Sequence, residues 1–72
     1  MPSIEIQVLE GVFSDDEKAR VIKGVTAGFA DVAGQAMGQN TSVRIVELKS
    51  GAWGYAGAVL TTEDGLAIKA RG

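Results

Sequence analysis

Residues 1–11 read MPSIEIQVLEG and have the alternation of a half-buried β-strand. Ile4, Ile6 and Val8 point to one face, and the polar residues between them point to the other. Pro2 heads the strand, where its missing N–H removes no interior ladder hydrogen bond. Initiator methionine is commonly trimmed before a small residue, and Pro2 would then carry a free secondary amine, a candidate general base. The alternative is that a proline simply follows the start methionine.

The next segment predicts an amphipathic helix over about residues 15–35. Ser14 and Glu17 have the S-x-x-E spacing of a capping box at a helix start. Gly34 and Gly38 are both candidate stops for the helix. Apolar residues recur between these signals at intervals of three and four: Val21, Ile22, Val25, Phe29, Val32, Ala33 and Ala36.

A second strand is predicted at residues 42–48, SVRIVEL, with apolar side chains on both of its faces. The order strand, helix, strand with a long crossover predicts a right-handed β-α-β unit with parallel strands. Alternating small residues at 53–60 predict a short C-terminal hairpin that packs close to another backbone. One helix can cover only one face of a two-stranded sheet, so a partner subunit is expected on the other.

The tail, residues 61–72, is ambiguous. Residues 63–65, Glu-Asp-Gly, indicate a turn. Leu66 and Ile68 fit either an edge strand or a short helical turn. The fold class predicted for the whole chain is therefore α+β, as a single domain over residues 1–72.

Composition narrows the class of protein. A chain of 72 residues buries only about 60% of its unfolded surface, so one core is seldom sufficient. The absence of Cys and His excludes disulfides, His-based triads and most zinc sites, which leaves oligomerisation as the stabilising device. The net charge of −2 without a basic cluster argues against a nucleic-acid partner. No membrane span or signal peptide is recognisable, so a cytoplasmic location is expected.

Five segments in this order resemble the tautomerase superfamily and, within it, the small 4-oxalocrotonate tautomerase subunits. They are Met1-Pro2, LEG at 9–11, SDDEK at 14–18, TSVR at 41–44 and WGYAG at 53–57. The resemblance covers about residues 2–60. It implies a β-α-β protomer, a homohexamer built as a trimer of dimers, and no cofactor or metal.

The resemblance also implies a reaction. The amino-terminal Pro2 would shuttle a proton between carbon and oxygen of a 2-hydroxy-dienoate or related enol, a small-molecule acid substrate. Arg44 matches the arginine that binds the substrate carboxylate, and its planar fork suits bidentate contact. Trp53 would supply an apolar wall, and Leu9 matches a substrate-binding position. A surface ion pair for Arg44 and plain packing for Trp53 are the alternatives.

One departure from the family pattern bears on the substrate. Members with full 4-oxalocrotonate activity carry an arginine directly after the glycine that closes the first strand, where this chain has Val12. A monoacid or aryl-pyruvate enol is therefore favoured over a dicarboxylate. Val12 also leaves open a catalytically silent subunit of a mixed oligomer. A hydratase or dehalogenase on the same fold, with Glu10 or Glu47 beside the proline, is a further alternative.

Overall fold

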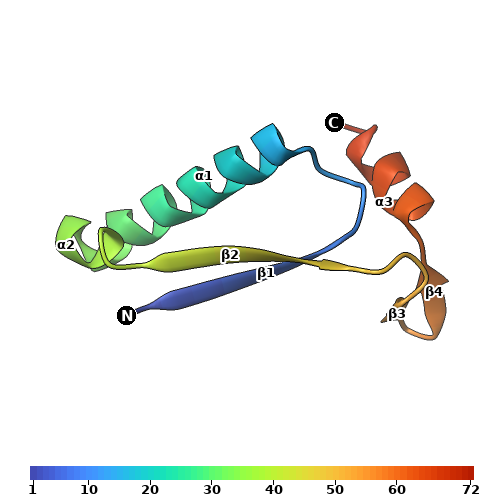
Figure 1. Ribbon diagram of the computed structural model, residues 1–72, viewed down its shortest axis with the longest axis horizontal. Helices are drawn as coiled ribbons and strands as arrows, with labels where there is room; N and C mark the ends of the chain where they lie inside the picture. Colours follow the sequence, from blue (N-terminus) through green and yellow to red (C-terminus); the bar gives the residue numbers. More distant parts are fainter.

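The computed structural model describes residues 1–72 and has a β-α-β unit at its centre. Strands β1 (Ser3–Leu9) and β2 (Ser42–Leu48) are parallel and pair along their whole length. Helix α1 (Asp15–Ala33) makes the crossover between them (Figure 1). The predicted topology is confirmed, and β2 has the bounds that the sequence indicated.

The start and end of α1 follow from local chemistry. The Ser14 backbone N–H donates to Glu17 Oε1 at 2.9 Å, and the Glu17 N–H donates to Ser14 Oγ at 3.2 Å, which completes the capping box. Gly34 ends the helix with φ 102°, a backbone conformation that residues other than glycine rarely adopt. A short helix, α2 (Gln35–Gly38), follows. The predicted C-terminus of α1 is therefore within two residues of the observed one.

Helix α2 turns back against the last part of α1. A Cβ atom on Gly38 would lie 2.5 Å from the Ala30 Cβ, so this close approach requires glycine. Ala30 is buried, whereas Val32 is 92% exposed. The prediction that Val32, Ala33 and Ala36 continue the core-facing stripe is wrong, since all three are exposed. The packed face of this turn passes through Ala30, which lies about 200° around the helix from Val32.

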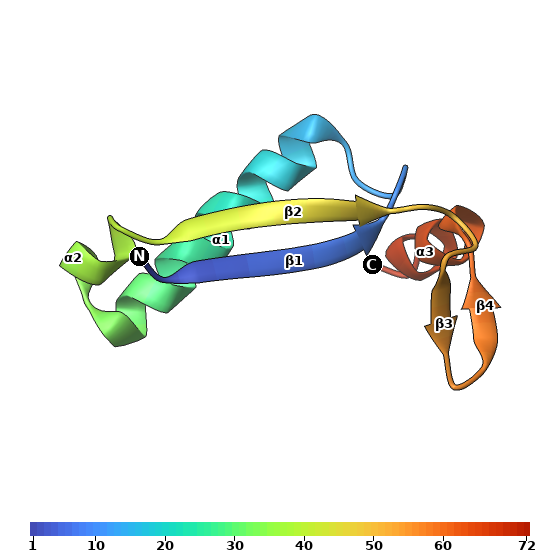
Figure 2. The same ribbon diagram turned by 60° about the horizontal axis from the view of Figure 1, so that its bottom comes forward.

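A hairpin follows the second strand. Strands β3 (Trp53–Tyr55) and β4 (Ala58–Leu60) are antiparallel, as the sequence predicted. Ala56 and Gly57 form its turn with φ of 51° and 85°, the positive values that tight hairpin turns require. Figure 2 shows the hairpin beyond the carboxyl ends of β1 and β2, separate from their sheet.

The tail forms a helix, α3 (Thr62–Lys69), which confirms the helical alternative for Leu66 and Ile68. The turn predicted at residues 63–65 and the edge-strand alternative are wrong. Thr61 is its N-cap. The Thr61 N–H donates to Asp64 Oδ2 at 2.8 Å, and the Thr61 side chain accepts from the Asp64 N–H. This second capping box makes residues 63–65 the first turn of a helix, because it outweighs the preference of Gly65 for a turn.

The two faces of the β1–β2 sheet have different surroundings. Helix α1 covers one face (Figure 1). On this face Lys18 Nζ pairs with Glu47 Oε2 at 3.0 Å. The apolar residues that alternate onto this face are Ile4, Ile6, Val8, Val43 and Ile45. No element of the chain covers most of the opposite face, which carries Glu5, Gln7, Arg44, Val46 and Leu48, and only its carboxyl end, at Leu9, is buried.

The protomer buries very little. Its only buried hydrophobic residues are Leu9, Val12 and Ala30. The radius of gyration is 14.3 Å, against about 11 Å for a compact domain of this length. The protomer is therefore elongated, with its longest dimension 40 Å, and lacks a conventional core. None of its helices has the length and apolar composition needed to cross a membrane.

Candidate active site

Pro2 lies immediately before β1 and is half-buried. Its carbonyl accepts a hydrogen bond from the Ser42 N–H at 2.9 Å, which fixes the proline backbone against the start of β2. The Met1 amine donates to the Asn40 carbonyl at 3.1 Å. With Met1 attached, the Pro2 nitrogen is an amide and cannot accept a proton. Removal of Met1 would leave the bond to Ser42 in place and create a secondary amine at this strand end.

Arg44 lies near the middle of β2, on the sheet face that α1 does not cover. Its register partner on β1 is Glu5, but that carboxylate accepts from Gln7 Nε2 at 3.3 Å, and Arg44 takes part in none of the ion pairs. The ion-pair alternative for Arg44 therefore finds no partner within the protomer. The exposed guanidinium is free to bind an anion.

Leu9 and Trp53 line one cleft of about 280 Å³ at the carboxyl end of β1. Seven of its ten lining residues are hydrophobic, and they come from β1, the loop after it, the hairpin and α3. Asp64 is the only charged residue in the lining, and Ile68 of α3 forms part of the wall. The cleft therefore offers an apolar surface with a carboxylate at its edge and no cation.

The structure brings together Leu9 and Trp53 but not all of the predicted site residues. Pro2 lies at the opposite end of β1, about 23 Å from Leu9 at the usual rise per strand residue. Arg44 belongs to the open sheet face and does not line the cleft. A site that uses Pro2, Arg44 and Trp53 together must therefore combine residues from more than one protomer.

Val12 has a structural role that its sequence position does not reveal. Val12 is 6% exposed. A Cβ atom placed on Gly65 would lie only 2.6 Å from the Val12 Cγ2. The glycine of α3 thus lets the helix settle directly on Val12. This loop position is therefore part of the small buried core.

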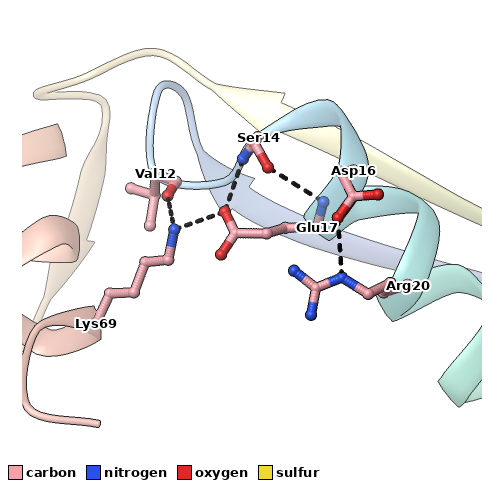
Figure 3. Close-up of polar contacts among 6 residues, drawn as sticks. All are labelled: Val12, Ser14, Asp16, Glu17, Arg20 and Lys69. Atoms are coloured by element: carbon pink, nitrogen blue, oxygen red, sulfur yellow. Dashed lines mark hydrogen bonds and ion pairs between the residues drawn. The ribbon is translucent and has the colours of Figure 1, made fainter.

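A polar network holds α3 against the start of α1 (Figure 3). Lys69 Nζ donates to the Val12 carbonyl at 2.9 Å and to Glu17 Oε1 at 2.6 Å, and it lies 5.3 Å from the centre of the Phe13 ring. The same Glu17 carboxylate accepts a hydrogen bond from the N–H of Ser14, the N-cap of α1, so it links α3 to the start of α1. The sequence offered a short helical turn at Leu66 and Ile68 as one alternative, but it did not indicate the contribution of α3 to the cleft. The T-x-x-D spacing at residues 61–64 was the available signal, whereas nothing local marks Lys69.

The two carboxylates considered as partners for a water-activating proline are engaged elsewhere. Glu47 pairs with Lys18 on the helix-covered face. Glu10 Oε2 accepts from the Ser50 N–H at 3.0 Å and so holds the loop before the hairpin. No group of three or more His, Cys, Asp or Glu side chains is placed to hold a metal ion. The geometry therefore gives Glu10 and Glu47 structural roles.

Comparison with protein families identifies the one to which the chain is similar. Residues 2–63 match the family model described as Tautomerase enzyme, which begins at Pro2 and extends through the hairpin. A search of curated proteins found no match to the chain. The matched region covers the β-α-β unit and all four predicted site residues, whereas most of α3 lies beyond it.

The Glu17 network predicts a pH dependence of stability. The hydrogen bond from Lys69, followed by that from the Ser14 N–H, lowers the pKa of Glu17 to about 2 from 4.5. Between about pH 2 and pH 4.5 the unfolded chain binds more protons at Glu17 than the folded chain does. The stabilisation by Glu17 is therefore present above about pH 4.5 and is lost as the pH falls toward 2. Screening moderates the effect, because the Glu17 side chain is 28% exposed.

Urea unfolding of wild type and Glu17→Gln from pH 7 to pH 2 measures this effect. The wild type should be more stable at neutral pH, and the difference should shrink as the pH falls below about 4.5. Glu63→Gln, on the exposed side of α3, is the matched control and should show no such convergence. A difference that stays constant to pH 2 would contradict the assigned cause of the pKa shift.

Proposed function

Because the chain belongs to the tautomerase enzyme family, we propose that it is a cofactor-independent enol–keto tautomerase, an isomerase whose general acid/base is the amino-terminal amine of Pro2. The observation that carries the proposal is the place of Pro2. It begins the family match and stands at the head of β1, held there by its carbonyl. Removal of Met1 converts its nitrogen from an amide into a base.

The proposed reaction moves one proton without net change in composition. The Pro2 amine accepts the enol hydroxyl proton as the C=O bond forms, and the resulting ammonium gives a proton to the substrate carbon. A group that both accepts and donates works best with a pKa near the operating pH. Apolar surroundings disfavour the charged form and so lower the pKa of an amine toward that range.

The other predicted residues support this reaction by binding the substrate. Arg44 holds the carboxylate of a 2-hydroxy-dienoate or aryl-pyruvate enol through two charge-assisted hydrogen bonds. Its lack of an ion-pair partner within the protomer and its place on the open sheet face support this role. Leu9 and Trp53 supply an apolar wall for the rest of the substrate, consistent with the cleft that they share.

The separation of Pro2 from Trp53 makes assembly part of the proposal. We propose a homohexamer, as the resemblance implies, in which neighbouring protomers bring their residues to a shared site. The uncovered sheet face and the small buried core support a tight oligomer. If Met1 is retained, the chain would instead be a catalytically silent subunit. The first experiment below distinguishes this alternative from an active tautomerase.

Two samples that differ only in Met1 test the role of Pro2. The processed protein should ketonise the enol of phenylpyruvate, with a rate that rises through one ionisation below the pKa of an ordinary α-amine. The sample that keeps Met1 should be inactive with an unchanged fold, and Pro2→Ala should retain part of the activity because a primary amine still carries a proton. Absorbance of the enol and intact mass are the measurements. Equal rates in the two samples would place the base elsewhere.

Arg44→Lys tests the carboxylate contact. Because an ammonium cannot supply the guanidinium fork, kcat/KM should fall by at least about tenfold, or ~1.4 kcal/mol, with assembly unchanged. Arg20→Lys is the matched control, since Arg20 pairs with Asp16 on the surface of α1 and should tolerate the change. Similar activity in Arg44→Lys and wild type would assign Arg44 to a surface role.

Light scattering tests the assembly. The wild type should have the mass of six chains at micromolar concentration. Val46→Asp places a charge on the uncovered sheet face and should dissociate the oligomer, because an unpaired buried charge is costly. Ala27→Asp, on the exposed side of α1, is the control and should not alter the mass. A wild-type monomer under these conditions would refute the proposed assembly.

A further inference from the structure

Helix α3 forms part of the wall of the cleft. It spans Thr62–Lys69, and residues 64–69 lie outside the segment that matches the family model. Three of its residues, Asp64, Gly65 and Ile68, line the cleft together with Leu9 of β1. The helix therefore shapes a site whose other walls belong to the matched part of the chain.

The N-terminal end of α3 is fixed by contacts with loops on the matched part. The Thr62 hydroxyl donates to the Glu10 carbonyl at 2.7 Å, and the Thr62 N–H donates to Ser50 Oγ at 2.9 Å. Ser50 is itself held by the Glu10 carboxylate through its N–H. These bonds set where the helix begins relative to the end of β1.

The rest of α3 is fixed against the loop after β1. Gly65 packs on Val12, and Lys69 Nζ binds both the Val12 carbonyl and Glu17. The lysine ammonium is thereby neutralised by a carboxylate and does not belong to the cleft lining. The wall that α3 presents to the cleft is thus a fixed one, and Ile68 and Asp64 define its chemistry.

The size and lining of the cleft indicate what it can hold. A cavity of about 150 Å³ already accommodates benzene, and this cleft measures about 280 Å³. Trp53 offers a flat aromatic surface on which a ring can stack. A carboxylate placed here would lose hydration, would find no cationic side chain in the lining, and would face the like charge of Asp64.

We propose that this cleft binds the uncharged aromatic end of the substrate and that α3, through Ile68 and Asp64, excludes substrates that carry a second carboxylate. The proposal rests on the tautomerase function proposed above and deepens it by assigning to α3 the selection of an aryl monoacid over a dicarboxylate. Binding of the ring does not depend on the Pro2 amine. It can therefore be measured in protein that cannot catalyse the reaction.

Trp53 provides a direct reporter, because it is the only tryptophan of the chain and lines the cleft. The probes are 3-phenylpropanoate, an aryl monoacid, and adipate, an aliphatic dicarboxylate. Calorimetry gives their dissociation constants, and Trp53 emission shows whether the cleft is occupied. The aryl monoacid should bind at least about tenfold more tightly than adipate, with a saturable change in emission. Equal affinities, or binding that leaves the emission unchanged, would overturn the proposal.

A charge introduced on α3 should reverse the selectivity. Ile68→Arg puts a cation in the wall and should tighten adipate binding by about tenfold while weakening 3-phenylpropanoate. Ala67→Arg is the matched control, because Ala67 is the neighbouring residue on α3 and does not line the cleft. Ile68 is 56% exposed, so the substitution leaves the small core intact. Identical affinities in the two variants would contradict the assignment of Ile68.

Asp64→Asn gives a second, milder comparison. The amide oxygen can still accept from the Thr61 N–H, so the cap is kept while the charge is removed. Adipate binding should strengthen, whereas Glu63→Gln on the same helix should leave it unchanged. An unaltered adipate affinity in Asp64→Asn would show that this carboxylate does not exclude the dicarboxylate.

The binding and activity measurements separate the two proposals. If 3-phenylpropanoate binds at Trp53 but neither the processed nor the Met1-retaining sample ketonises an enol, the tautomerase proposal fails and the cleft assignment stands. If the processed protein ketonises dicarboxylate and aryl enols with equal kcat/KM, the tautomerase proposal stands and the role assigned to α3 is wrong.

Discussion

A single helix can cover only one face of a two-stranded parallel sheet, and this limit shapes the whole protomer. Helix α1 uses its packed face against β1 and β2 (Figure 1), and the opposite sheet face stays open. Only Leu9, Val12 and Ala30 are buried among the hydrophobic residues. Such a core is too small to stabilise a chain of this length by itself. Stability and a complete site therefore both depend on contacts outside the β-α-β unit.

The C-terminal helix supplies part of those contacts within the chain. Its capping box at Thr61 sets the start of α3, and the bonds to Glu10 and Val12 carbonyls use acceptors that the end of β1 leaves free. Lys69 then links α3 to the first turn of α1 through Glu17 (Figure 3). These contacts order the loop between β1 and α1, which is also one wall of the cleft. Fold stability and the shape of the cleft are thus coupled at the same residues.

The parts of the fold that could be predicted carry local signals. Alternation marks both strands of the sheet, and the Ser14 capping box marks α1. Helix α3 also has a local signal at Thr61, but Gly65 indicates a turn when the tail is considered alone. Its glycine is explained only by the close contact with Val12, which is distant in sequence. The predicted site residues rest on resemblance alone, and the distance between Pro2 and the cleft follows from strand geometry that a list of motifs does not contain.

Val12 shows why a single residue type can mislead. The resemblance draws attention to Val12 only because it stands where an arginine was expected. In the structure, Val12 is the surface against which Gly65 packs. A long charged side chain at position 12 would have to displace α3 or be buried beneath it without a partner, which is energetically costly. The nearby cation, Lys69, is already committed to Glu17. A cation at position 12 is thus incompatible with α3 packed on this loop, and Val12 and Gly65 together give this end of the cleft an apolar wall.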